Sequence, residues 1–170
     1  MKNLSGKCIL VIDDDPAMLR ALSRVLSGEG AKAICASWVG DGMEFLTKRD
    51  LQVDLVITDL RMPFVSGMTV LYSIQQIFPK LPVIVLTAFG SPEVRAACGE
   101  EGAFAFLEKP LESDDLLQAV HKALGLAAPG TQATVSRGTN PSGSSRPIES
   151  RKQPSSTIAN SAQEKKYNTS

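Results

Sequence analysis

Five short apolar runs, separated by segments with helix signals, organise the first 125 residues of the chain. The runs occupy residues 7–12, 32–36, 55–58, 82–86 and 103–107. Apart from Lys7, Lys32 and Thr58 at their ends, the runs are apolar and do not alternate with polar residues, which is typical of parallel strands with both faces covered by helices. The pattern therefore predicts a repeated strand–helix arrangement around a central parallel sheet.

Helix start signals support this alternation. Asp15 and Ser91 each precede a proline, which is the arrangement of a capping residue followed by the first helical position. We predict helices over residues 16–27, 41–49, 66–78 and 92–98, and a last helix that Ser113 caps.

Strand–helix units of this kind join through right-handed crossovers. The predicted fold is therefore α/β, a five-stranded parallel sheet that is doubly wound, with the flavodoxin-like strand order 2-1-3-4-5. After residue 126 the sequence is dominated by Ser, Thr, Gly, Pro, Asn and Gln and shows no helical or strand period. We predict one domain over residues 1–126 and a disordered Ser/Pro/Gly-rich tail over residues 127–170.

Charge and cysteine content exclude few functions. Residues 1–125 contain 12 Lys/Arg and 16 Asp/Glu, a net of −4, while residues 126–170 contain 6 and 2, a net of +4, so neither part requires nucleic acid or a membrane surface as partner. The three cysteines are far apart, which favours small buried side chains in a reducing compartment. No apolar stretch approaches a membrane span or a signal peptide, and we expect a cytoplasmic protein.

Polar residues stand where four of the predicted strands end. Asp13 and Asp14 follow the first strand, Asp59 the third, Thr87 the fourth and Lys109 the fifth. Because ligands of open parallel sheets bind at the carboxyl ends of the strands, these side chains should converge on one pocket. Helix capping alone would explain Asp15, but it would not explain two further acids before it. Paired carboxylates of this kind suit Mg²⁺.

The pocket also offers the parts needed for phosphoryl chemistry. With a cation to neutralise the site, the Asp59 carboxylate can attack a phosphoryl donor, as aspartate nucleophiles do when they form aspartyl phosphates. Thr87 can donate a hydrogen bond to a phosphoryl oxygen, and Lys109 can neutralise phosphoryl charge. Each of these residues alone could be an ordinary strand or surface residue; the prediction depends on the set.

The motifs around these residues resemble those of response regulator receiver domains, the CheY-like phosphoacceptor modules of two-component systems. The resemblance runs from about residue 7 to residue 125, and the matching motifs are Ile-Leu-Val-Ile-Asp-Asp-Asp-Pro at 9–16, Asp-Leu-Val-Ile-Thr-Asp-Leu-Arg-Met-Pro at 54–63, Pro-Val-Ile-Val-Leu-Thr-Ala at 82–88 and Phe-Leu-Glu-Lys-Pro at 106–110. It implies a phosphoprotein of a phosphorelay in which Asp59 is phosphorylated in a Mg²⁺-dependent reaction. The implied metal ligands are Asp13, Asp14, Asp59 and the main-chain carbonyl of Arg61. The implied catalytic residues are Asp59, Thr87 and Lys109, and the implied switch residues are Thr87 and Phe106.

The resemblance also implies partners and an output. The phosphoryl donor would be a histidine kinase or a phosphotransfer protein, and the receiver would catalyse its own phosphorylation and dephosphorylation without acting on outside substrates. A conformational switch would signal to a downstream protein through the face of the fourth helix, fifth strand and fifth helix, and a dimer that forms on phosphorylation is left open. We expect no DNA-binding domain in this chain and no membrane partner. Phe106 lacks the hydroxyl of the tyrosine often found there, and Phe64 is bulky where small or acidic residues are frequent.

Two other functional hypotheses use the same residues. A Mg²⁺-dependent phosphatase of the haloacid-dehalogenase type would need an acid two residues after its nucleophile, but Arg61 occupies that position. A pure interaction module that has lost phosphorylation would not be expected to keep all five site residues.

Overall fold

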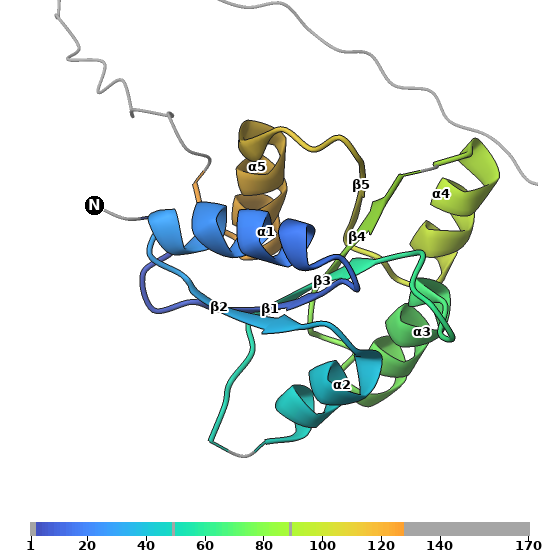
Figure 1. Ribbon diagram of the computed structural model, residues 1–170, viewed down its shortest axis with the longest axis horizontal. Helices are drawn as coiled ribbons and strands as arrows, with labels where there is room; N and C mark the ends of the chain where they lie inside the picture. The colour runs from blue at the N-terminus through green and yellow to red at the C-terminus, as the bar shows by residue number, and fades with distance from the viewer. Residues whose placement is uncertain (1–2, 49, 89, 128–170) are drawn as a thin grey trace, which may run out of the picture. The chain divides into compact units, whose positions relative to one another are not determined.

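The computed structural model describes residues 3–48, 50–88 and 90–127. Strands and helices alternate along these residues (Figure 1). Their order is β1 (Cys8–Ile12), α1 (Pro16–Gly28), β2 (Lys32–Ala36), α2 (Val39–Thr47), β3 (Leu55–Asp59), α3 (Gly67–Ile77), β4 (Val83–Thr87), α4 (Pro92–Glu100), β5 (Ala105–Glu108) and α5 (Ser113–Ala123).

The five strands form one parallel sheet in the order β2-β1-β3-β4-β5, which confirms the predicted fold and topology. The chain reverses its direction of winding at β1, which lies between β2 and β3. The register aligns Ile12 of β1 with Thr58 of β3, so the residues that follow them, Asp13 and Asp59, lie at the same level of the sheet. The topology thus places the polar strand ends along one edge.

Each strand contributes to two separate cores because its side chains alternate between the faces of the sheet. On β1, Ile9 and Val11 pack with α1 and α5, whereas Leu10 and Ile12 pack with α2, α3 and α4. The helices accordingly cover both faces of the sheet (Figure 1). Burial on both faces explains why the strands are apolar runs without alternation.

Side-chain caps explain where three of the helices begin. Asp15 accepts a hydrogen bond from the Ala17 N–H, Ser66 from the Met68 N–H and Ser91 from the Val94 N–H. The expectation for the last helix is wrong, because Ser113 is already its first helical residue. The cap position is held by Glu112, which makes no side-chain capping bond, and two acids in the first turn of α5 complement the helix dipole instead.

The second helix also differs from the prediction. It begins at Val39, two residues before the expected start, and its cap residue Trp38 makes no side-chain capping bond. Without a capping side chain the sequence carries no signal for the start of this helix. Cys35 is exposed, so only Cys8 and Cys98 fit the expectation of buried thiols.

The described residues include no helix that is both long and apolar enough to cross a membrane. The predicted tail lies outside the described residues, apart from its first residue, Ala127.

Candidate functional site

Three carboxylates meet at the carboxyl end of β1 and β3. Asp13, Asp14 and Asp59 each offer one oxygen, and these oxygens all lie within 4.8 Å of one another. Asp13 and Asp59 are buried, whereas Asp14 is exposed. The structure therefore brings together the three acids that the sequence predicted to converge, with two of them in the floor of the site and one at its border.

Asp13 is held by contacts on both of its oxygens. Its Oδ1 accepts a hydrogen bond from the backbone N–H of Asp15 at 2.8 Å, and its Oδ2 accepts one from Lys109 Nζ, also at 2.8 Å. Asp15 in turn caps α1, as capping residues do. The three consecutive acids thus have different surroundings: Asp13 is buried, Asp15 is exposed and caps α1, and Asp14 is exposed at the border of the site.

Lys109 is the cation of the site. Its Nζ lies 2.8 Å from Asp13 Oδ2 and 3.4 Å from Asp59 Oδ2, and only 17 % of its side chain is exposed. Its backbone N–H donates to the Thr87 carbonyl at 2.7 Å, which ties the end of β5 to the end of β4 and directs the lysine to the acids. Three carboxylates and one ammonium leave a formal charge of −2 when all four groups are ionised.

The pKa values of the site reflect this crowding. Burial raises the pKa of Asp59 above its ordinary value, the charge of Asp13 raises it further, and the attraction of Lys109 offsets only part of the rise. Burial alone would lower the pKa of Lys109, but its hydrogen bond to Asp13 and the charges of Asp13 and Asp59 together raise it. The lysine therefore stays protonated, and the Asp59 carboxylate is less stable as an anion than an exposed aspartate.

The donor set fits a hard divalent cation. Asp59 Oδ1 is buried and has no hydrogen-bond partner among the described residues. A buried carboxylate oxygen without a partner is costly, and a cation ligated by it and by Asp14 would satisfy it. The formal charge of −2 matches the charge of Mg²⁺.

The other predicted site residues occupy neighbouring positions. Thr87 is the last residue of β4 and is buried. Arg61 is exposed two residues after Asp59 and pairs with Ser66 in a short antiparallel bridge. Phe106 lies on β5 and is half-buried against the core shared by α2, α3 and α4. The roles of these three residues stay predictions.

The loop after β3 is closed tightly by Gly67. The Gly67 N–H donates to the Leu60 carbonyl at 2.9 Å, and a Cβ on Gly67 would collide with the Asp59 carbonyl oxygen. The sequence predicted a helix start at residue 66 but gave no sign of this close approach. At the tip of the loop, Phe64 is 96 % exposed and has a φ of 69°. Residues other than glycine rarely adopt this region of backbone conformation.

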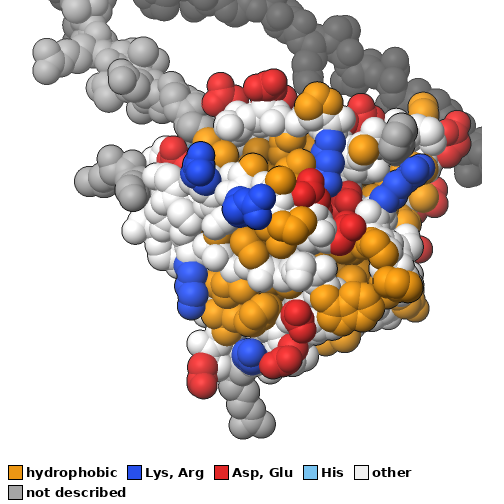
Figure 2. Space-filling model, viewed as in Figure 1, with side chains coloured by type: hydrophobic (Ala, Val, Ile, Leu, Met, Phe, Trp, Pro, Cys, Tyr) orange, Lys and Arg blue, Asp and Glu red, His pale blue; other side chains and the backbone are white. Residues whose placement is uncertain are grey.

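The border of the site next to Asp14 is apolar. A cavity of about 180 Å³ is lined by Asp14, by residues 37–39 at the start of α2 and by residues 62–64 in the loop after β3. Figure 2 shows hydrophobic side chains gathered over the region of α2 and α3. Partners that approach the acids from this direction therefore meet an apolar surface.

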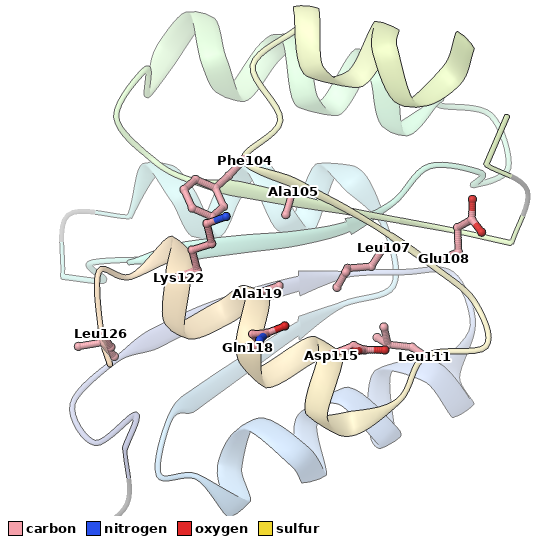
Figure 3. Close-up of a pocket in the computed structure, with 10 residues that line it drawn as sticks. All are labelled: Phe104, Ala105, Leu107, Glu108, Leu111, Asp115, Gln118, Ala119, Lys122 and Leu126. Atoms are coloured by element: carbon pink, nitrogen blue, oxygen red, sulfur yellow. The ribbon is translucent and has the colours of Figure 1, made fainter. Parts of the chain in front are cut away.

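A larger cavity of about 740 Å³ lies between β5 and α5 (Figure 3). Leu107 and Glu108 of β5 line it together with Asp115, Gln118 and Lys122 of α5. Neither Lys109 nor any of the three acids lines this cavity, so it is distinct from the acidic site.

Comparison with known proteins gives one consistent result. The family model described as response regulator receiver domain matches residues 9–121. The transcriptional regulatory protein GlrR of Escherichia coli K12 is 42 % identical over 123 residues, which are 72 % of this chain and 27 % of that protein. The DNA-binding transcriptional regulator NtrC of the same organism is 31 % identical over 116 residues, which are 68 % of this chain and 24 % of that protein.

Solved structures agree with the sequence relatives. A response regulator receiver domain protein from Clostridium thermocellum superposes with a TM-score of 0.66 at 36 % identity and covers 70 % of this chain and 94 % of its own. The beryllofluoride-activated NtrC4 receiver domain dimer gives a TM-score of 0.65 at 27 % identity and covers 74 % and 98 %. The chain spans about a quarter of the length of the two curated relatives.

Proposed function

Because the chain belongs to the response regulator receiver domain family, which serves as the phosphoacceptor of two-component systems, we propose that Asp59 is the residue that accepts the phosphoryl group. The observation that carries the proposal is the Asp59 carboxylate, whose buried Oδ1 has no hydrogen-bond partner among the described residues. Its Oδ2 lies 3.4 Å from the Lys109 ammonium, and the carboxylates of Asp13 and Asp14 lie beside it. The pKa of Asp59 is raised, which is typical of a group poised for chemistry.

The reaction is an in-line displacement at phosphorus. A carboxylate oxygen of Asp59 attacks the phosphorus of a phosphohistidine on the donor protein, and a new O–P bond forms as the N–P bond breaks. The electron pair of that bond returns to the imidazole nitrogen of the donor. Lys109 Nζ, 3.4 Å from Asp59 Oδ2, is placed to neutralise charge on the transferred group, and Thr87 at the end of β4 is proposed to donate its hydroxyl to a phosphoryl oxygen.

Hydrolysis of the aspartyl phosphate completes the cycle. A water oxygen attacks phosphorus and gives up a proton to solvent while the O–P bond to Asp59 breaks. The electron pair of that bond restores the Asp59 carboxylate, and inorganic phosphate leaves. We propose that the same side chains serve both steps, so that the receiver catalyses its own phosphorylation and dephosphorylation.

We propose that Asp13, Asp14, Asp59 and the Arg61 carbonyl hold Mg²⁺. When bound, the ion supplies positive charge that lowers the repulsion between the acids and an incoming phosphoryl group. Each Asp13 oxygen accepts one hydrogen bond, from the Asp15 N–H or from Lys109 Nζ, and keeps a second lone pair for a cation. Asp59 Oδ1 has no hydrogen-bond partner among the described residues, so both of its lone pairs are available.

We propose that a histidine kinase or phosphotransfer protein is the donor, and that the output surface is the face of α4, β5 and α5. The groove of Figure 3 belongs to this face, and its mixed apolar and charged lining suits a protein partner. The relatives named above include a DNA-binding regulator, and one solved relative is a dimer. For this chain we propose a downstream protein as target, and a dimer on phosphorylation as a second form of the same output. The proposed compartment is the cytoplasm.

Labelling with radioactive acetyl phosphate tests the assignment, and Asp54 offers a matched control. Asp54 directly precedes the strand that Asp59 ends, and it pairs with Lys7 at 3.2 Å. Wild-type protein and Asp54→Asn should take up one hydroxylamine-labile phosphoryl group in the presence of Mg²⁺, whereas Asp59→Asn should take up none. EDTA should abolish labelling of the wild type. Undiminished labelling of Asp59→Asn would refute the assignment.

We further propose that the receiver is complete within residues 1–126. A chain that ends at Ala128 should be labelled at the same rate as the full chain, and its thermal unfolding midpoint should be unchanged. Slower labelling of the shortened chain would show that the tail contributes to the site.

A further inference from the structure

A cluster of side chains connects α4 with the end of β5 around the proposed switch residue. Phe106 and Glu108 are two residues apart on β5, so their side chains start from the same face of the strand. The guanidinium carbon of Arg95, in α4, lies 4.7 Å from the centre of the Phe106 ring. The same guanidinium lies 3.6 Å from the Glu108 carboxylate. One charged side chain of α4 therefore contacts both residues.

Gly90 closes another side of this cluster. A Cβ on Gly90 would lie 2.7 Å from Phe106 Cε1 and would also collide with Glu108 Oε1. The ring and the carboxylate thus fill the space that a side chain at this position would need. The loop between β4 and α4 is thereby in contact with the same two side chains of β5.

The contacts of Phe106 differ on its two sides. Its ring packs against the core shared by α2, α3 and α4. Arg95, half-exposed, places its guanidinium over the ring. A cation over an aromatic face is attractive, and the same guanidinium lies 3.6 Å from the Glu108 carboxylate. Movement of Phe106 therefore takes the ring away from the guanidinium.

We propose that Arg95 is a positioning residue that holds Phe106 in the place it occupies while Asp59 is a free carboxylate, and so sets how readily the receiver switches. The proposal rests on the proposed function and on the switch role implied for Thr87 and Phe106, in which the Phe106 ring moves toward Thr87 when Asp59 is phosphorylated. Loss of Arg95 removes an interaction made only before the movement and favours the switched form.

Binding of beryllofluoride with Mg²⁺ measures this equilibrium, because the complex mimics the phosphoryl group. Arg95→Ala should lower the beryllofluoride concentration for half-saturation about three-fold, the size expected for a half-exposed cation–π contact. Arg95→Lys keeps the charge and should lie between Arg95→Ala and the wild type. Arg24→Ala removes an exposed arginine from α1, on the other face of the sheet, and should leave the concentration unchanged.

A double-mutant cycle with Phe106→Leu shows whether Arg95 acts through the ring. In the Phe106→Leu background, Arg95→Ala should no longer change beryllofluoride binding. The same three-fold effect in both backgrounds, or no effect in either, would overturn the proposal. If Arg95 had only a structural role, Arg95→Ala would lower the free energy of unfolding, but its effect on beryllofluoride binding would not depend on Phe106.

The aromatic NMR signals of Phe106 in the free protein distinguish a failure of the positioning role from a failure of the proposed function. Arg95→Ala should shift the ring signals of Phe106, which the Phe106→Leu variant assigns. If the ring signals shift but the wild type does not bind beryllofluoride, the proposed function fails and only the contact between Arg95 and Phe106 is established. If the wild type binds and neither the signals nor the affinity respond to Arg95→Ala, the positioning role fails alone.

Discussion

Replacing Asp59 by asparagine should stabilise the protein in the absence of Mg²⁺, although it abolishes the proposed function. Three effects of the Asp59 charge decide the sign. Lys109 attracts it at 3.4 Å, which is about 5 kcal/mol at an effective dielectric constant of about 20. Asp13 repels it from within 4.8 Å, which is about 3.5 kcal/mol on the same scale. Asp14 is exposed, and its repulsion is screened by water.

The Coulomb terms therefore nearly cancel, and burial decides the result. The effective cost of burying a carboxylate is on the order of several kcal/mol, and Asp59 is only 7 % exposed. Burial is also the largest cause of its raised pKa. Asparagine removes this cost and leaves Lys109 paired with Asp13 at 2.8 Å. We expect a gain of about 2 kcal/mol in the free energy of unfolding, which for a domain of this size raises the thermal midpoint by roughly 6–10 °C.

Urea unfolding in EDTA, followed by far-UV circular dichroism, measures the gain. Asp54→Asn is the control with the opposite sign, because Asp54 accepts hydrogen bonds from the Cys8 N–H at 2.8 Å and Lys7 Nζ at 3.2 Å, and its replacement should cost about 1 kcal/mol. A loss of stability in Asp59→Asn similar to that in Asp54→Asn would show that the attraction of Lys109 outweighs burial, and would refute the reasoning.

The gain should also depend on pH and Mg²⁺. The folded-state pKa of Asp59 lies above its ordinary value of 3.8, so between these two pKa values the folded protein binds more protons than the unfolded chain. The unfolding free energy of the wild type should therefore rise relative to that of Asp59→Asn as the pH falls through this window, and the difference should shrink. Added Mg²⁺ should shrink this difference as well, because Mg²⁺ should bind the folded wild type more tightly than folded Asp59→Asn and so stabilise the wild type more.

Substitutions at three further positions test other parts of the structure by the same urea unfolding. His121→Leu should stabilise the protein by about 1–3 kcal/mol, because both ring nitrogens are buried without a hydrogen-bond partner among the described residues; a loss would indicate a polar partner. Phe64→Gly should add about 1 kcal/mol by relieving the φ of 69°, while Phe64→Ala, which keeps a Cβ, should add less; equal gains would argue against backbone strain. Gly67→Ala should cost more than about 2 kcal/mol, because its Cβ would collide with the Asp59 carbonyl oxygen, and an unchanged midpoint would contradict this close approach.

Helix boundaries could be predicted where a short-range signal exists. Asp15 and Ser91 cap their helices as expected, because a capping side chain acts within three residues. The start of α2 was missed because Trp38 makes no such bond, and Ser113 was misplaced by one position because Glu112 occupies the cap without a side-chain hydrogen bond. Short-range signals could not indicate these two boundaries.

The sequence by itself determined the layered fold and the convergence of Asp13, Asp14 and Asp59. Apolar runs fix which segments are buried on both faces, and the parallel topology then brings the strand ends to one edge whatever the loops do. Only the tertiary structure decided which groups pair within that edge. Lys109 reaches Asp13 across 96 residues of sequence, and Asp59 keeps one buried oxygen without a partner among the described residues. Such contacts depend on strand register and on angstrom-scale loop geometry, which no local pattern encodes. The same holds for the contact of Arg95 with the Phe106 ring, which forms because α4 packs beside β5.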